Sequence, residues 1–250
     1  PTTEEALAEC STGGIDFGAV VRHGRDVGGA ALRAMTFAER AEMLKALAKA
    51  LHEHREELID VSIRNAGTTR GDAKFDIDGA TGTLSAYAYF GQELGDRPFL
   101  VDGDGVQLGR TPRFWGRHVL VPRPGVAVHI NAFNFPAWNM FEKAACAWLA
   151  GVPVIEKPGT STAMLAYVMG KKAVESGVLP AGAFQLLCGR TGDLLDHLGP
   201  QDTLAFTGSA ATGLKLRSHE TLLRHGVRVN IEADSLNAAV LGPDADMTSD

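Results

Sequence analysis

The chain has 250 residues, 45% hydrophobic and 22% charged, a composition typical of globular α/β proteins. The net charge is −6 and the Lys and Arg residues are scattered, which argues against a nucleic-acid partner, because phosphate backbones require clustered positive charge. No apolar run reaches the roughly 18 residues that a membrane-spanning helix needs.

The amino terminus and the cysteines indicate in which cellular compartment the protein is expected. Pro1-Thr-Thr-Glu-Glu5 carries acid where a signal peptide would carry positive charge and then an apolar stretch. The three cysteines have irregular spacing that suits neither a disulfide framework nor a metal site. We therefore expect a cytoplasmic protein with no bound metal and no membrane partner.

The amino-terminal part, residues 1–118, is predicted to be mainly helical. Thr36-Phe-Ala-Glu39 is a capping box, and leucines at helical spacing predict a helix to about Ile63 that ends near Gly67. A second helix is expected over 77–90. Residues 95–118 are rich in Gly, Pro and charge, and we expect a loop there with a hairpin.

From residue 119 to 250, short apolar runs alternate with amphipathic helical segments. The predicted strands are 125–131, 152–156, 184–188, 203–206, 227–231 and 238–241. The predicted helices are 136–150, 161–175, a short one near Leu194, and 210–224. This alternation predicts an α/β fold, with a parallel Rossmann-type sheet covered by helices on both faces. Ligands of such sheets bind at the carboxyl ends of the strands.

The loop after the fourth strand, Phe206-Thr-Gly-Ser-Ala-Ala-Thr-Gly213, is a candidate phosphate site. Free N–H groups at a helix start attract phosphate, and Ser209 or Thr212 can add a hydroxyl. The spacing matches neither GxGxxG nor a Walker sequence. The alternative is a glycine turn with a serine cap.

The loop after the first strand, Asn131-Ala-Phe-Asn-Phe-Pro136, carries two asparagines in apolar surroundings. Asn134 is a candidate oxyanion donor, aiming its amide at a substrate oxygen. The alternative is that Asn134 caps the helix beginning at Pro136.

Two charged residues at strand ends are further candidates. Lys157 lies at the end of the second strand and could hold a ribose or phosphate; the alternative is a solvated lysine. Glu232 ends the strand 227–231, and in apolar surroundings desolvation would suit such a carboxylate to act as general base. The alternative is a surface glutamate at a turn.

The thiols and one histidine have plainer interpretations. Cys146 is expected to pack in the core from its helix, and Cys188, at a strand end, is a slightly better candidate for chemistry. Cys10 has no neighbour that would activate it. His129 lies within a strand without an evident partner in sequence, and a packed histidine is expected.

The order of these motifs, Asn-Phe-Pro, Lys-Pro, Phe-Thr-Gly-Ser and then a strand-terminal glutamate, resembles the aldehyde dehydrogenase superfamily over roughly residues 30–250. The resemblance implies an oxyanion-stabilising amide at Asn134 and a water-activating base at Glu232. It implies cofactor contacts at the following residues: Ile130, Asn131, Phe133, Lys157, Gly159, Thr160, Gly192, Phe206, Thr207, Gly208, Ser209, Thr212 and Ala233.

Family members place the nucleophilic cysteine a few tens of residues beyond this glutamate, outside these 250 residues, and none of the three cysteines present matches it. Where most members have Leu-Gly-Gly-Lys after the glutamate, this chain has Ala233-Asp-Ser-Leu-Asn237. That variant is similar to the phenylacetate-pathway and box-pathway members, which oxidise CoA-linked semialdehydes in aerobic aromatic degradation. In the phenylacetate-pathway members an enoyl-CoA hydratase domain is joined to the dehydrogenase.

Thr160 stands where NAD-preferring members carry a glutamate, so the resemblance implies NADP, with NAD possible as a second cofactor. It also implies a small-molecule aldehyde as substrate and a homodimer or higher homo-oligomer. Two other functions stay open at this point. One is a nucleotide-binding module without catalysis. The other is an acylating dehydrogenase that transfers the acyl group to CoA, although a water-activating glutamate argues against it.

Overall fold

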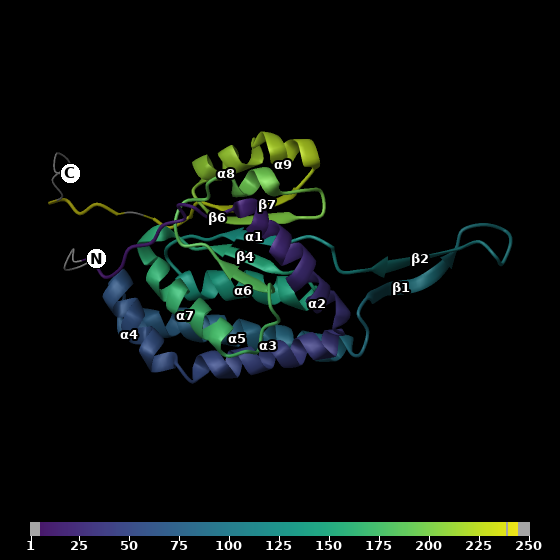
Figure 1. The fold of residues 1–250 in the computed structure, drawn as a ribbon, viewed down its shortest axis with the longest axis horizontal. Coiled ribbons are helices and arrows are strands. Elements are labelled where there is room, and N and C mark those ends of the chain that lie inside the picture. The colour runs from purple at the N-terminus through teal and green to yellow at the C-terminus, as the bar shows by residue number, and fades with distance from the viewer. Residues whose placement is uncertain (1–5, 239, 245–250) are drawn as a thin grey trace.

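A five-stranded parallel sheet forms the centre of the structure, a computed structural model that describes residues 6–238 and 240–244 (Figure 1). The order is β5-β4-β3-β6-β7. The strands are β3 (Ala127–Ile130), β4 (Val154–Lys157), β5 (Phe184–Leu186), β6 (Thr203–Gly208) and β7 (Arg228–Ala233). The chain starts at the central strand, proceeds to one edge, and then crosses to the other side. This reversal makes a topological switch point between β3 and β6, where ligands of such sheets bind.

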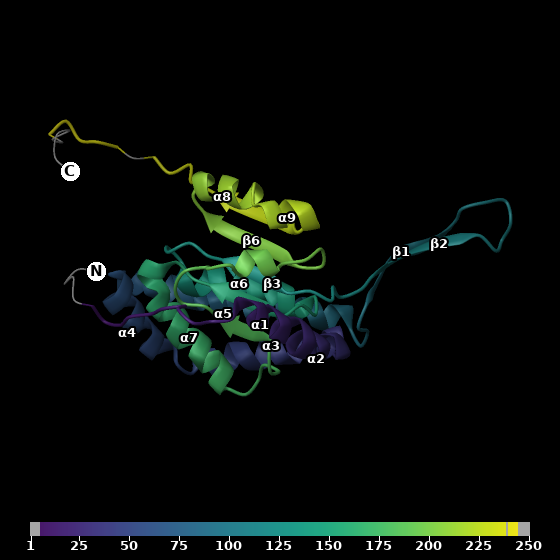
Figure 2. The same ribbon diagram turned by 45° about the horizontal axis from the view of Figure 1, so that its top comes forward.

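Helices cover both faces of the sheet, as predicted (Figures 1 and 2). They are α1 (Phe17–His23), a π-helical segment (Gly24–Gly28), α2 (Gly29–Ala34), α3 (Phe37–His52), α4 (Arg55–Ala66), α5 (Arg70–Leu94), α6 (Pro136–Leu149), α7 (Ala163–Glu175), α8 (Ala210–Arg217) and α9 (Glu220–His225). Short 3-10 turns lie at Thr160–Thr162 and Leu194–His197. The predicted capping box at Thr36 and Glu39 is formed, and Gly67 ends α4 with a left-handed φ of 68°.

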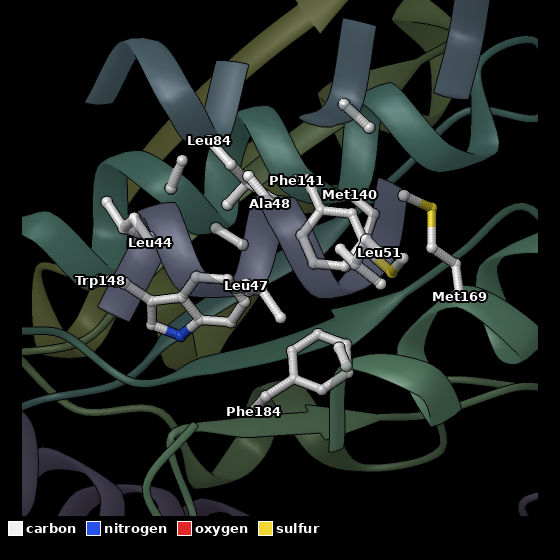
Figure 3. Packing of buried hydrophobic residues seen from close by; sticks show 14 of the residues in the cluster. Leu44, Leu47, Ala48, Leu51, Leu84, Met140, Phe141, Trp148, Met169 and Phe184 are labelled. Atoms are coloured by element: carbon white, nitrogen blue, oxygen red, sulfur yellow. The ribbon is translucent and has the colours of Figure 1, made fainter. Parts of the chain in front are cut away.

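The two faces of the sheet bury separate hydrophobic clusters. Helices α3, α5, α6 and α7 pack against the face that carries Ala127 and Val154 (Figure 3). In this cluster the indole N–H of Trp148 donates to the Ala183 carbonyl at 2.9 Å. Val128 and Ile130 point to the opposite face, where they join side chains from α1, α8 and α9. Alternation along β3 thus connects both clusters through one strand.

A β-hairpin extends away from the body of the structure, and it begins within the stretch 95–118 where a hairpin was expected and runs two residues beyond it (Figure 1). It consists of β1 (Leu100–Gln107) and β2 (Trp115–Leu120), which pair antiparallel with a register shift between Asp102 and Val106. Several large apolar side chains on it are exposed.

Several predicted elements differ from the observed ones. The single helix expected from Thr36 to Ile63 is two helices, because the chain turns at residues 53–54 and α4 starts afresh with acidic residues in its first turn. The helix expected over 210–224 is likewise broken, at residues 218–219. No helix was predicted over 17–34, where α1 and α2 form.

A further difference concerns the strand expected over 238–241. Residues 238, 240 and 241 are not in a strand, and residue 239 lies outside the described residues, as do the acidic residues 1–5. Over the described residues, the structure contains no helix with both the length and the apolar composition needed to cross a bilayer.

Candidate functional site

The predicted site residues of four strands meet at one edge of the sheet. In the strand register Ile130 lies beside both Lys157 and Phe206, and Thr207 lies beside Glu232. This edge is formed by the carboxyl ends of β3, β4, β6 and β7. The parallel topology therefore brings together residues that are far apart in sequence, at the edge where α/β proteins bind ligands.

Asn134, in the loop between β3 and α6, has an exposed side chain. The alternative that it caps α6 is wrong. Phe135 occupies the N-cap position and makes no side-chain capping bond. The backbone N–H groups of Ala137 and Trp138 donate instead to the two carboxylate oxygens of Asp76 on α5, at 3.1 and 2.7 Å. Capping thus comes from another helix, and the Asn134 amide is not used for it.

Asp76 was not singled out from the sequence, because nothing near it in the chain indicates its partner. Its side chain is buried, and burial raises its pKa to about 6, although the two backbone hydrogen bonds act in the opposite direction. It is therefore an acid held out of water at the start of the helix that follows Asn134.

A second polar cluster lies buried beneath the loop. His129 is packed, as expected, and its carboxylate partner comes from the neighbouring strand: Nδ1 lies 2.6 Å from Glu156 Oε1. The Asn131 amide donates to Glu156 Oε2 at 2.7 Å, while its own Oδ1 is buried without a hydrogen-bond partner among the described residues. Burial raises the pKa of Glu156, and the charge of His129 lowers it. The cluster holds Asn131 at the root of the loop.

Lys157 is partly buried at the end of β4, so the alternative of a fully solvated lysine is wrong. Its ammonium donates to the Pro158 carbonyl at 2.9 Å, and burial lowers its pKa. Gly159 lets this loop approach the Asn134 loop, since a Cβ there would lie 2.9 Å from the Phe133 backbone. Thr160 is exposed at the start of the next turn.

The loop between β6 and α8 begins the helix as a glycine turn with a serine cap. The Ser209 hydroxyl accepts from the Thr212 N–H, and both side chains are exposed. A Cβ on Gly208 would lie 2.5 Å from the tip of the Phe206 ring, so any larger residue here would displace that ring. The Ala210 N–H is taken by the Asp234 carboxylate at 2.8 Å, a contact that the sequence did not indicate.

Glu232 is the penultimate residue of β7 and accepts a hydrogen bond from the Thr207 hydroxyl at 3.2 Å. The apolar surroundings expected for it are not found within the described residues, because its side chain is exposed. Ala233 pairs with Gly208 at the end of the same ladder.

Gly192 is the predicted cofactor residue that lies outside these strand-end loops. It follows β5 with a φ of +48°, and a Cβ there would lie 2.4 Å from the Phe17 ring. Backbone conformation and packing against α1 are therefore sufficient reasons for glycine at this position.

The thiols differ from expectation in one case. Cys146 is exposed, so its predicted core packing was wrong. Helix α6 directs Ala144, Ala145 and Trp148 into the core, and Cys146 falls on the outer face. Burial raises the pKa of Cys188 to about 11, which keeps it a thiol at neutral pH.

Comparison with known proteins finds aldehyde dehydrogenases. The model of the aldehyde dehydrogenase family matches residues 1–250. A 3,4-dehydroadipyl-CoA semialdehyde dehydrogenase of Aromatoleum evansii is 51% identical over 98% of this chain and 48% of its own length. An NADP(+) succinate-semialdehyde dehydrogenase of Escherichia coli is 28% identical over 87% of this chain and 43% of its own length.

Solved structures agree with these relatives. An NADP-dependent enzyme of E. coli superposes with a TM-score of 0.72 at 27% identity, covering 87% of this chain and 44% of that one. An NAD-dependent benzaldehyde dehydrogenase of Corynebacterium glutamicum gives the same TM-score at 26% identity, covering 87% and 46% of the two chains. The chain spans about half the length of the curated relatives that it matches.

Proposed function

Because this chain belongs to the aldehyde dehydrogenase family, we propose that it supplies the cofactor-binding part of an enzyme that oxidises an aldehyde to the carboxylic acid with NADP. The observation that carries the proposal is the meeting of Asn134, Lys157, Ser209 and Glu232 at the carboxyl edge of one parallel sheet. Four loops of the expected chemistry lie at the edge where such sheets bind nucleotides.

The proposal assigns the nucleophile to a cysteine outside these 250 residues. Its thiolate forms a C–S bond to the aldehyde carbon, and the Asn134 amide, with a backbone N–H, stabilises the resulting oxyanion. A bound nicotinamide would supply the acceptor for the hydride of this carbon. Glu232 takes a proton from water, which attacks the thioester and releases the acid and the thiolate.

The site has groups that fit a dinucleotide. Lys157 would hold the adenosine ribose, and the Ser209 and Thr212 hydroxyls, with the start of α8, would hold the pyrophosphate. The Asp234 carboxylate now takes the Ala210 N–H, and a pyrophosphate would displace it from that position. The remaining predicted contacts, such as Phe133 and Gly192, would surround these.

Glu232 can be tested through the order of the two half-reactions. In the complete enzyme Glu232→Gln should leave the first burst of reduced cofactor intact and slow steady-state turnover by about 10²–10⁴-fold, since it removes only the general base. Loss of the burst itself would refute this role.

NADP preference is supported by the exposed Thr160, which would not repel a 2′-phosphate. Titration of both cofactors into the complete enzyme should give tighter binding of NADP. Thr160→Glu should reverse the order, because a carboxylate repels the phosphate and accepts hydrogen bonds from the free ribose hydroxyls. Equal or tighter NAD binding by the wild type would contradict the proposal.

We further propose that the substrate is a CoA-linked semialdehyde. The 51% identity to the relative named above supports this class. A groove of about 820 Å³ between α3 and α5 offers Lys45 and Lys49 to the phosphates of CoA, beside Glu53 and the Arg55–Asp78 ion pair, which line the same groove. Lys45→Ala with Lys49→Ala should raise KM for a CoA-linked semialdehyde and leave KM for a short free aldehyde unchanged; an equal effect on both would contradict it.

We also propose that the complete protein is a homo-oligomer. The hairpin β1–β2 supports this, because Val106, Trp115 and Val119 are 61%, 56% and 46% exposed on an element that is marginally stable alone. Sedimentation of the complete protein should show a dimer or larger species, and a monomer at micromolar concentration would refute it.

A further inference from the structure

The start of α6 is held entirely by α5. Pro136 has no N–H, and the Asn139 N–H bonds within the helix to the Phe135 carbonyl at 2.9 Å. The two donors between them, Ala137 and Trp138, both donate to Asp76. A single buried carboxylate therefore satisfies every N–H of the first turn that the helix itself leaves open.

The same face of α5 also fixes the Trp138 side chain. Gly79 lies one turn after Asp76, and a Cβ there would come within 2.5 Å of the indole ring. Thr83 lies one turn further on, and its hydroxyl accepts from the indole N–H at 3.0 Å. This hydroxyl in turn donates to the Gly79 carbonyl at 2.8 Å. Asp76, Gly79 and Thr83 thus form a cradle whose spacing matches one face of a helix.

Hydrogen bonds also fix the start of the Asn134 loop, at Asn131. The Asn131 backbone N–H donates to the Lys157 carbonyl at 3.0 Å, and its side chain is held by Glu156. In mid-loop the Thr162 hydroxyl donates to the Phe133 carbonyl at 2.7 Å. Both ends of the loop are fixed, while Asn134 between them presents an exposed amide.

We propose that Asp76, supported by Gly79 and Thr83, is a positioning residue for Asn134; this rests on the proposed oxyanion role of that amide. An asparagine just before a helix would ordinarily cap it and turn its side chain inward to the backbone. Because Asp76 performs the capping from α5, the Asn134 amide is left for substrate. Burying a carboxylate is unfavourable in itself. The capping of α6, which leaves Asn134 free, explains why the buried Asp76 is present.

The test measures the single-turnover rate of reduced-cofactor formation in the complete enzyme at saturating aldehyde and cofactor. Asp76→Ala should lower this rate about 10- to 100-fold, a part of the roughly 10²- to 10³-fold that loss of an oxyanion donor costs. The dissociation constant of the cofactor should change less than about twofold, since the β6–α8 loop is untouched. Asp72→Ala, an exposed aspartate one turn earlier on α5, is the matched control and should leave the rate unchanged.

A double-mutant cycle separates positioning from a merely structural effect. In an Asn134→Ala background, Asp76→Ala should lower the rate less than about threefold. An equal loss in both backgrounds, or a wild-type rate in Asp76→Ala, would overturn the inference. If Asp76→Ala does not fold, Thr83→Val carries the same cycle, because it is isosteric and removes only the hydroxyl, with its bonds to the indole and to the Gly79 carbonyl. If Asn134→Ala alone retains the wild-type rate, the proposed function of Asn134 has failed.

Discussion

Replacing His129 by leucine should destabilise the protein strongly, because it leaves the buried Glu156 carboxyl without its imidazole partner. Glu156 is 0% exposed, and its Oε1 lies 2.6 Å from His129 Nδ1. Removing one partner and leaving a buried carboxylate uncompensated costs about 3–5 kcal/mol. The remaining bond from the Asn131 amide at 2.7 Å is neutral and does not balance a full charge. The cost is limited because the carboxyl can take up a proton, as burial already raises its pKa.

Thermal unfolding of the complete protein measures this effect. For a domain of about 150–250 residues each kcal/mol shifts Tm by roughly 2–4 °C, so the expected loss is about 6–20 °C. The loss should be larger at pH 8 than at pH 5. A carboxyl whose folded pKa is raised contributes stability below its unfolded pKa, and that contribution disappears as pH rises through the folded value.

The double variant His129→Leu with Glu156→Leu should recover most of the stability, since apolar replacement of a buried pair is often neutral. It leaves one cost of about 1–3 kcal/mol, the unpaired Asn131 amide. Lys171→Leu, which breaks an exposed pair with Glu175 at 3.7 Å, is the control and should shift Tm by less than about 2 °C. A double variant as unstable as the single one would refute the reasoning.

Three other predictions follow from buried groups and close contacts. The pKa of Asp76 is raised from 3.8 to about 6, so its ionised form is the disfavoured one in the fold. The unfolding free energy of the wild type minus that of Asp76→Asn should therefore fall by about 3 kcal/mol as pH rises through this window. Denaturant titrations that give a constant difference would contradict it. Gly28→Ala should destabilise by several °C in Tm, since its Cβ would lie 2.0 Å from a backbone carbonyl oxygen, whereas Gly82→Ala, with open space around it, should be neutral or stabilising by up to about 1 kcal/mol. Iodoacetamide at pH 8 should modify the exposed Cys146 well before Cys188, whose pKa is raised to about 11, and mass spectrometry that shows the reverse order would refute that assignment.

The strands β3 and β4 were predictable, because strands buried on both faces have short, nearly continuous apolar sequences. In β7 apolar and polar residues alternate instead, which is the pattern of a half-buried strand. Five of the six expected strands form, and their order along the chain places the candidate residues at one edge. The helices over 17–34 were not predictable in the same way. Glycines interrupt their pattern, and Gly28 is there because the helix touches the backbone of Gly182, a contact 154 positions away that no local rule encodes.

The site shows the same division between local and distant causes. That the loop of Asn134 and Lys157 lie at the same edge of the sheet follows from parallel topology, which the sequence indicates. That Asp76 caps α6 depends on how two helices pack, and the local rule therefore selected Asn134 as the cap. The outward position of Cys146 was missed for a related reason: an apolar neighbourhood in sequence does not specify which side of a helix faces the core.

The central place of β3 has a consequence for how the chain reaches its fold. It is the first strand of the sheet to be synthesised, yet its neighbour β6 follows only after α6, β4, α7 and β5. Sheets with such non-local pairing close slowly, since loop entropy is lost before contacts form. The last buried residue of the cluster around α3, α5, α6 and α7 is Phe184. This cluster can therefore pack before β6 and α8 cover Val128 and Ile130 on the opposite face. Pulse-labelled amide exchange during refolding should therefore protect α5 and α6 before β7, and simultaneous protection would exclude this order.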